Sequence, residues 1–401
     1  MGKWFQQLKD YMESRFFFRE LKNFFRKGDM VLLIMCLAIS AFSCLVISSV
    51  TGAAKFGGST RYIFNQLLSI GGGVVMFAIM SSIDLEFLSE HRRTLIIFNM
   101  FLLLLLIPFG TDNNTGNRSW LDFPFLPFYI QPAEICKIFY ILITASVMNS
   151  HQNNLSSFRS VIHIAGHLLL VFLTNMVISK DLGVSLIFVF IFLGMTFAGG
   201  MNLGWFIGGG AGIALASPIL WNHFMDTHQK NRILVLFDPS IDPQGIGVRY
   251  HSRLSLQSLT GGGITGQGLF QGNRTQAGAL PAQHTDFIFS SIGEELGYLG
   301  CALVVIALFA LVARCIWVGI QSPDNMRRLV CFGAAAALMF QVLINVGMCI
   351  GVVPIIGLTL PLISYGGSST FTIYAMLGLV SGVYARPAPR SHERYIRPPR
   401  Y

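Results

Sequence analysis

Two long runs without a charged side chain constrain this chain more than any other feature of its sequence. Residues 329–385 contain no Asp, Glu, Lys or Arg over 57 positions, and residues 182–225 contain none over 44. A transmembrane helix needs about 20 mostly apolar residues, so each run has room for two such helices. The runs exclude an ordinary soluble enzyme, a disordered protein and a coiled coil. They predict a polytopic membrane protein.

Apolar segments bounded by charges predict an all-α membrane protein with about ten transmembrane helices. Helices are expected because membrane-spanning strands have about ten residues of alternating polarity, whereas these segments are longer and apolar on every side. The predicted spans are Met30–Val50, Ile63–Ile83, Leu95–Phe109, Ile135–Met148, Ser160–Ser179, Leu182–Ala198, Leu203–Trp221, Leu296–Ile320, Leu329–Ile350 and Leu362–Tyr384.

The distribution of basic residues predicts that both termini are cytoplasmic. With the N-terminus placed inside, the inner segments hold 18 of the 28 Lys and Arg residues. Short cytoplasmic segments of membrane proteins carry such an excess, so the net charge of +9 is explained without a nucleic-acid partner. Residues 1–29 form a basic tail, which is either an amphipathic helix in the inner interface or a plain basic anchor. Residues 386–401 form a second tail, rich in Arg and Pro and predicted to be disordered.

Residues 30–385 are therefore predicted to be one membrane domain. Its largest loop, residues 223–295, lies on the outer side between the seventh and eighth spans and has 73 residues. Loops of this length are generally functional or disordered, so chemistry is expected on the outer face. All seven Cys fall in apolar segments, which predicts buried fillers and no disulfide framework.

Asp286 is the first candidate for chemistry, because it lies just before the apolar entry into the eighth span. A carboxylate near the membrane surface is partly desolvated, which raises its pKa and suits it to act as a general base. The alternative is a helix N-cap formed by Thr285 or Asp286 before the apolar run, and the residues alone favour this cap.

Three more ionisable residues lie at the outer ends of predicted spans. Glu134 and Lys137 are three residues apart and share a helix face, so they predict an ion pair, the wall of a polar cavity, or both. Asp181 follows Lys180 in a short turn, where it is either an interfacial charge pair or a carboxylate that faces the outer cavity.

Basic side chains of the large loop are candidates for binding an anion. Arg249, Arg253 and Arg274 suit bidentate phosphate contacts, although loop arginines are more often simply solvated. His284 and Asp286 are close enough to share a metal, but two residues do not make a metal signature. The Gly-rich stretch 261–268 lacks the Gly-Lys-Ser/Thr ending of a phosphate loop, so no nucleotide is expected.

Four motifs carry a resemblance to a known family. Gln131-Pro-Ala-Glu134-x-x-Lys137 resembles Gln-Pro-Ser-Glu-x-x-Lys, and Lys180-Asp181-Leu-Gly183 resembles Gln-Pro-Asp-x-Gly. The other two are longer: Leu280-Pro-x-x-His-Thr-Asp286-Phe-Ile-Phe with Gly293-Glu-Glu-Leu-Gly297, and Pro354-x-x-Gly-x-x-Leu-Pro361-x-x-Ser-Tyr-Gly-Gly-Ser-Ser369. Together with the ten spans they identify the chain as a somewhat divergent, RodA-like member of the SEDS family of RodA, FtsW and SpoVE.

The resemblance implies an enzyme of the bacterial cell membrane. SEDS proteins are peptidoglycan glycosyltransferases that join lipid II, a disaccharide-pentapeptide on undecaprenyl diphosphate, into glycan strands during elongation, division or sporulation. They act outside the membrane with a class B penicillin-binding protein and other elongation or division proteins. A divalent cation, Mg²⁺ or Mn²⁺, is implied, and the family's essential loop Asp corresponds to Asp286.

We therefore expect Asp286 to take the proton of the acceptor hydroxyl. Residues expected to bind the substrate are Glu134, Lys137, Asp181, Arg249, Arg253, Arg274 and His284.

The chain also departs from the family pattern. Ala282 stands where a Glu is usual, and Leu254 where a Gln is common. Two alternatives therefore stay open, a lipid II flippase and a non-catalytic scaffold that activates a penicillin-binding protein. A flippase requires charges along a path through the bilayer, whereas here the ionisable residues gather at the outer ends of the spans.

Overall fold

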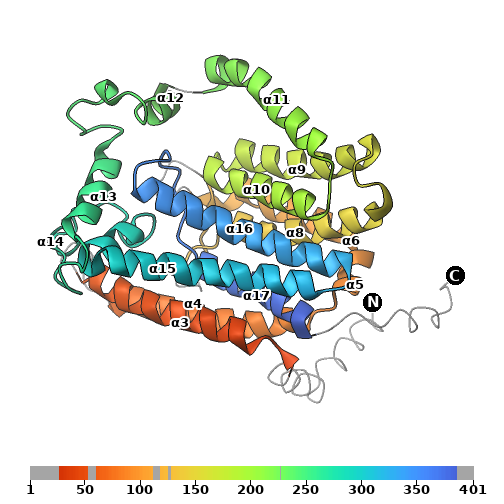
Figure 1. Ribbon diagram of the computed structural model, residues 1–401, viewed down its shortest axis with the longest axis horizontal. Coiled ribbons are helices and arrows are strands. Elements are labelled where there is room, and N and C mark those ends of the chain that lie inside the picture. Colours follow the sequence, from red (N-terminus) through yellow and green to blue (C-terminus); the bar gives the residue numbers. More distant parts are fainter. Residues whose placement is uncertain (1–26, 53–59, 112–117, 125–127, 226, 386–401) are drawn as a thin grey trace.

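The computed structural model describes residues 27–52, 60–111, 118–124, 128–225 and 227–385. The predicted C-terminal tail and most of the predicted N-terminal tail lie outside these residues. The described chain is a bundle of long helices packed side by side (Figure 1). Its helices are α3 (Met30–Val50), α4 (Thr60–Ser82), α5 (Leu85–Glu90), α6 (Arg92–Leu104), α7 (Leu106–Phe109), α8 (Pro132–Ser150), α9 (Phe158–Ile178), α10 (Leu182–Ala198), α11 (Leu203–Ile219), α15 (Ile288–Gln321), α16 (Asn325–Cys349) and α17 (Gly367–Ala385).

All ten predicted spans correspond to helices of the described bundle. Nine helical segments are long and apolar enough to cross a membrane, with α6 and α7 together forming one of them, and α10 is a shorter apolar tenth. Helices α3 and α10 have the predicted bounds. The prediction of an all-α membrane protein is confirmed.

Two predicted boundaries are wrong for identifiable reasons. Helix α15 begins at Ile288 rather than Leu296, because Glu294 and Glu295 are buried in protein and so do not mark the edge of the apolar segment. Gly297 interrupts this helix with a φ of +67°. Helix α17 begins at Gly367 rather than Leu362, because residues 351–366 fold as a loop over the helix ends.

Small residues let α4 and α17 approach closely. A Cβ added to Gly378 would lie 2.5 Å from the backbone oxygen of Phe77, and one added to Gly382 would lie 2.8 Å from that of Ser81. Such contacts are typical of helix pairs in membranes, where van der Waals packing replaces the hydrophobic driving force.

Burial separates the inner helices from the outer ones. About four-fifths of the spanning windows of α8 and α17 are buried, which places both helices inside the bundle. Helix α11 has no buried residue and stands apart at one edge (Figure 1). The helix that carries Glu134 and Lys137 is therefore surrounded by protein rather than by lipid.

The helices alternate in direction, so the bundle has two distinct ends. At one end, which we call the terminal end, α3 begins where α17 finishes, and the Asp29 N–H donates to the Ser381 hydroxyl over 3.0 Å. Helices α6, α9, α11 and α16 also begin at this end. At the other end, which we call the loop end, α4, α8, α10, α15 and α17 begin. Residues 220–287 fold there around η3 (Leu220–Phe224), α12 (Thr227–Leu234), η4 (Pro239–Ile241), α13 (Tyr250–Gly261) and α14 (Asn273–Gln276).

The second connection at the loop end is a small hairpin. Strand β1 (Gly110–Thr111) pairs antiparallel with β2 (Trp120–Leu121), and Leu121 bridges to Ile130 just before α8. This pairing fixes the start of α8 at the loop end, beside the turn between α9 and α10.

Candidate active site

Asp286 lies in the turn before α15, and its backbone is held by α16. The Asn345 amide donates to the Asp286 carbonyl over 2.8 Å and to the Leu358 carbonyl over 2.6 Å. Asn345 is completely buried, so a single side chain ties this turn to the loop that follows α16. These two hydrogen bonds fix the turn in place, and they use the Asp286 carbonyl rather than its side chain.

The loop of residues 351–366 covers the same turn from a second side. The Ser364 hydroxyl donates to the Thr285 carbonyl over 2.6 Å, and the Tyr365 N–H donates to the His284 carbonyl over 2.9 Å. Gly357 has a φ of +70°, and a Cβ added there would lie 3.5 Å from Oδ2 of Asp286. The C-terminal signature thus forms a wall next to the carboxylate.

The environment of Asp286 raises its pKa to about 6. Burial is the main cause, because it disfavours the charged form, and the nearby negative charge of Asp181 adds to it. A hydrogen bond from Thr285 acts in the opposite direction. At neutral pH the carboxylate is mostly ionised yet more basic than an ordinary Asp, which is the state that a general base requires.

The Asp181 carboxylate accepts hydrogen bonds at the starts of two helices, and it does not form the charge pair with Lys180 that was one of the two alternatives. Its Oδ1 accepts from the Val184 N–H over 3.1 Å and caps α10, while its Oδ2 accepts from the Gln131 amide over 3.2 Å. Burial raises the pKa of Asp181, and the charge of Glu134 raises it further. Lys180 is exposed, with a φ of +55°. Asp181 therefore faces the polar groups at the start of α8.

Glu134 and Lys137 form the predicted ion pair. The distance between Nζ and Oε2 is 2.7 Å, and both side chains are almost fully buried. The Thr372 hydroxyl of α17 donates to Oε2 of Glu134 over 3.1 Å. The pair joins α8 to α17, and the negative charge of Glu134 helps to raise the pKa of Asp181. The structural lock is therefore present, and the role of the pair as the wall of a polar cavity stays a prediction.

His284 packs against two aromatic rings, close to the turn that carries Asp286. Its ring centroid lies 5.3 Å from that of Tyr62 and 5.6 Å from that of Tyr365. Burial lowers the pKa of His284 to about 4. The imidazole is therefore neutral at physiological pH and suits stacking or hydrogen bonding rather than charge neutralisation.

The three predicted loop arginines have separate positions. The Arg274 guanidinium donates to the Gln257 carbonyl over 3.2 Å and lies 3.9 Å from Oε1 of Glu294. Arg253 donates to the Gln244 carbonyl over 2.9 Å. Arg249 precedes α13, and its N–H donates to Asp242 over 3.0 Å. In these contacts Arg253 and Arg274 hold the loop together, and their role toward a substrate stays a prediction.

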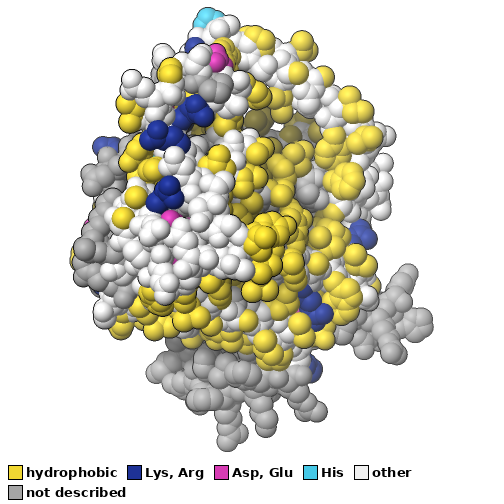
Figure 2. All heavy atoms as spheres, turned by 60° about the vertical axis from the view of Figure 1, so that its left-hand side comes forward, with side chains coloured by type: hydrophobic (Ala, Val, Ile, Leu, Met, Phe, Trp, Pro, Cys, Tyr) yellow, Lys and Arg dark blue, Asp and Glu magenta, His cyan; other side chains and the backbone are white. Residues whose placement is uncertain are grey.

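Arg232 is a cation that the sequence analysis missed. Its Nη1 lies 3.5 Å from the Ile355 carbonyl in the loop next to Asp286, and its charge helps to lower the pKa of His251 after the larger effect of burial. The His251 ring stacks on Phe287, the residue after Asp286, at 6.0 Å. With the loop end turned forward, Lys and Arg side chains gather on the large loop beside a hydrophobic surface (Figure 2). The packing of distant segments, rather than any local sequence pattern, places Arg232 against the loop next to Asp286.

Glu294 and Glu295 are a second set of residues whose role the sequence did not reveal. Glu294 accepts from the N–H groups of Arg274 and Thr275, and Glu295 accepts from the Ser49 hydroxyl and the Gln276 amide, at 2.7 to 2.9 Å. Both carboxylates are buried. They anchor α14 to α15 and α3, so their role is to hold the loop.

The two departures from the family pattern also have defined places. Ala282 has a φ of +51°, and the neighbouring Gln283 is buried, with its amide donating to the Val50 and Thr275 carbonyls. Leu254 packs against the hydrophobic core. Neither residue disrupts the turn that carries Asp286.

This arrangement defines an integral membrane protein with an acidic, partly desolvated site at the loop end of a helical bundle. The chain belongs to the cell cycle protein family of FtsW, RodA and SpoVE, whose family model matches residues 28–387. The predicted family is therefore confirmed.

Curated relatives span nearly the whole chain. It is 32% identical over 360 residues to peptidoglycan glycosyltransferase MrdB of Escherichia coli K12, covering 89% of this chain and 93% of that protein. It is 30% identical over 367 residues to stage V sporulation protein E of Bacillus subtilis 168, covering 88% and 96%. The name of MrdB confirms the predicted class of enzyme, a peptidoglycan glycosyltransferase.

Solved structures share the fold. A chain in a peptidoglycan synthase complex, described as coordinating polymerization and crosslinking, matches with a TM-score of 0.75 and 27% identity, covering 92% of this chain and 99% of that one. Rod shape determining protein RodA of Thermus thermophilus matches with a TM-score of 0.63 and 25% identity, covering 89% and 96%. The multi-pass membrane architecture is the one these proteins have.

Proposed function

We propose that this chain polymerises lipid II into glycan strands, with Asp286 as the general base. The observation that carries the proposal is the convergence at the loop end. Asp286, Asp181 and the Glu134–Lys137 pair come from three distant segments. The charge of Glu134 raises the pKa of Asp181, and the charge of Asp181 raises the pKa of Asp286. Carboxylates with shifted pKa values that lie close together are typical of an active site.

The reaction requires one proton acceptor and one charged leaving group. The acceptor sugar's 4-hydroxyl oxygen bonds to the anomeric carbon of the donor, and the bond from that carbon to the diphosphate oxygen breaks. The hydroxyl proton passes to the Asp286 carboxylate, and the bonding electrons leave with the undecaprenyl diphosphate. The raised pKa of Asp286 supports this role, because a base is most effective when its pKa lies near the working pH.

Substrate binding is proposed at the boundary between the bundle and the large loop. Both substrates carry lipid tails, so the reacting sugars must lie at the membrane surface. Lys137 pairs with Glu134, and Arg232 donates to the Ile355 carbonyl in the loop beside Asp286, so each offers a positive charge near the carboxylates. Arg249, Arg253 and Arg274 supply further positive charge on the loop for the diphosphate.

A divalent cation, Mg²⁺ or Mn²⁺, is part of the proposal. Among the described residues no three His, Cys, Asp or Glu side chains are grouped as a metal site. Mg²⁺ commonly binds through one or two carboxylates together with substrate phosphates, and Asp181 fits as such a carboxylate. When bound, the cation would neutralise charge on the leaving diphosphate.

The orientation follows from charge. We assign the terminal end, with Arg92, Arg93, Arg159, Arg327 and Arg328, to the cytoplasm, and the loop end to the outer face of the bacterial cell membrane. A class B penicillin-binding protein is the proposed partner. Its support is the likeness to a chain of a peptidoglycan synthase complex. A RodA-like role in elongation is proposed within this frame, together with the other proteins of that process.

The test is glycan polymerisation by the purified full-length chain in liposomes. Labelled lipid II and Mg²⁺ or Mn²⁺ are supplied, with and without the penicillin-binding partner. Asp286→Ala is compared with Asp238→Ala, a matched control, because Asp238 is an acid of the same loop whose carboxylate accepts from the Ser240 N–H. Polymer is expected from the wild type and from the control, and none from Asp286→Ala.

Two other outcomes would replace the proposal. Absence of polymer from every variant, with crosslinking by the partner still dependent on this chain, would indicate a scaffold. Transfer of labelled lipid II between leaflets without polymer would indicate a flippase.

A further inference from the structure

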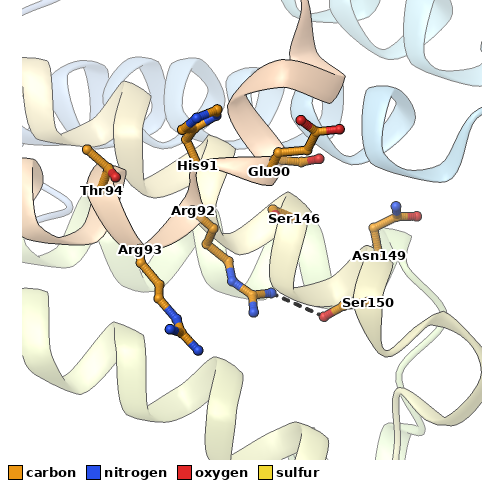
Figure 3. A pocket seen from close by; sticks show the side chains of 9 residues that line it. Glu90, His91, Arg92, Arg93, Thr94, Ser146, Asn149 and Ser150 are labelled. Carbon is orange, nitrogen blue, oxygen red and sulfur yellow. Dashed lines mark hydrogen bonds between the residues drawn. The ribbon is translucent and has the colours of Figure 1, made fainter. Parts of the chain in front are cut away.

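A polar cavity lies at the terminal end, on the opposite side of the bundle from Asp286. It has a volume of about 500 Å³ and lies between the turn joining α5 to α6 and the last turns of α8. Its nine lining residues are Ser89, Glu90, His91, Arg92, Arg93, Thr94, Ser146, Asn149 and Ser150 (Figure 3). The reaction proposed above uses none of them.

The cavity presents two guanidinium groups and several neutral hydrogen-bonding groups. Arg92 is half-buried and donates to the Ser150 hydroxyl over 3.3 Å. Arg93 is exposed. Glu90 is the one acidic residue among the nine, and its carboxylate points away from both guanidinium groups (Figure 3). The lining is therefore suited to an anion, and Arg provides the geometry that phosphate oxygens prefer.

A cation on a neighbouring helix strengthens the positive potential. His151 follows the end of α8, and its ring lies 3.3 Å from the ring of His163 on α9. Burial lowers the pKa of His151, and the charges of His163, Arg92 and Arg159 lower it further. His151 is therefore neutral at physiological pH, and Arg159 of α9 adds its positive charge to those of Arg92 and Arg93 on α6.

The outer surface of α6 continues from this cavity as a hydrophobic face. Ile97 is 70% exposed and Phe101 is 52% exposed, and both lie one to three turns from Arg92 on a predicted span. Across from them α9 exposes Phe158 and Ile162. In a bilayer these side chains face acyl chains. A polar, cationic cavity therefore meets a tail-contacting surface at the membrane boundary.

We propose that this cavity binds the phosphodiester head group of an anionic phospholipid in the adjacent leaflet. The Arg92 guanidinium and the adjacent Ser150 hydroxyl take the phosphate, Arg93 adds a second positive charge, and the acyl chains lie along α6. Free phosphate shares the head-group chemistry, but it gains nothing from the exposed apolar side chains of α6. Basic pockets between transmembrane helices bind lipid head groups in this manner. The inference is independent of the proposed polymerase activity.

The test is native mass spectrometry of the full-length chain in detergent, titrated with phosphatidylglycerol or phosphatidylcholine. Arg92→Gln/Arg93→Gln is compared with Lys27→Gln/Arg328→Gln, which removes the same charge from the same end without altering the cavity lining. The cavity variant is expected to lose about thirtyfold in phosphatidylglycerol affinity, from two basic side chains near the head group. The control is expected to stay within about threefold, because screening weakens distant charges.

Further arms make the result decisive. If the double variant is not monodisperse, Arg93→Gln alone is measured, with an expected loss of about fivefold. Equal binding of the two lipids by the wild type, or an unchanged affinity in the cavity variants, would overturn the proposal. Competition by inorganic phosphate as effective as that of a second anionic lipid would overturn the lipid assignment in favour of a free-phosphate site.

Discussion

Asp286 and Glu294 lie eight residues apart in the same signature, yet the fold treats the two carboxylates in opposite ways. Glu294 is completely buried and accepts hydrogen bonds from the Arg274 N–H and from the N–H and hydroxyl of Thr275. Asp286 is half-buried, and its side chain faces Gly357 and the charge of Asp181. Hydrogen-bond donors compensate the charge of Glu294, whereas Asp286 keeps a raised pKa.

The difference teaches how a reactive group is recognised among structural ones. Buried charges are normally compensated by hydrogen bonds or by an ion pair, as Glu294 and the Glu134–Lys137 pair are. Asp286 instead has a pKa that burial raises to about 6, so keeping its carboxylate charged costs folding energy. Such a cost is expected where chemistry requires it. The following predictions test this division.

Asp286→Asn is expected to have the largest effect on activity. Removing a general base lowers polymerisation by about 10²- to 10⁴-fold. The thermal unfolding midpoint should be retained or should rise slightly, because folding disfavours the charged carboxylate. Initial rates with labelled lipid II, together with a thermal unfolding curve, check both parts. A variant that loses activity only because it unfolds would place Asp286 with the structural carboxylates.

Lys137→Met is expected to have the largest effect on stability. It leaves Glu134 buried and uncompensated, and breaking one side of a buried ion pair costs about 3–5 kcal/mol. Glu134→Gln/Lys137→Met removes both charges and should recover much of this loss. Unfolding of the three proteins in detergent measures the effect. If the single and double variants are equally destabilised, the pair acts through packing and not through charge.

Glu294→Gln is expected to destabilise the loop by about 1.5–3 kcal/mol, the range for hydrogen bonds to a charged group. The amide would direct hydrogens at the donors of Arg274 and Thr275, so α14 should become open to proteolysis. Polymerisation per folded molecule should change much less than in Asp286→Asn. Limited proteolysis and activity, both normalised to folded protein, separate the two effects. A loss of activity as large as that of Asp286→Asn would remove the contrast between the two residues.

The fold could be read from the sequence because the lipid environment leaves few choices. Uncharged runs of sufficient length must be helices in a bilayer, so α3 and α10 were located to the residue. The assumption that charged residues mark the end of a span placed the start of α15 wrongly. Glu294 and Glu295 look like a solvent boundary in the sequence, and only tertiary donors from α14 and α3 reveal that they are buried.

The site could be predicted only in part. The spacing of Glu134 and Lys137 on one helix predicts their contact, because such pairs depend on local geometry. The approach of Asp181 to Asp286 and the position of Arg232 beside Ile355 depend on how distant helices pack. For Asp286 the residues alone favoured a helix cap. The structure shows instead that Phe287 occupies the cap position and that no side chain provides the capping hydrogen bond.

The pH dependence of polymerisation gives the finest test of the comparison. Asp286 must be ionised to accept a proton, so the rate should fall below a midpoint near the pKa of about 6, approaching tenfold for each pH unit. Asp181→Asn should move this midpoint downward, because the negative charge of Asp181 raises the pKa of Asp286. Initial rates from about pH 4.5 to about pH 8 at subsaturating lipid II measure both midpoints. A wild-type midpoint in the ordinary range of Asp would mean that the surroundings of Asp286 do not make it a stronger base. An unmoved midpoint in Asp181→Asn would mean that burial alone makes it basic.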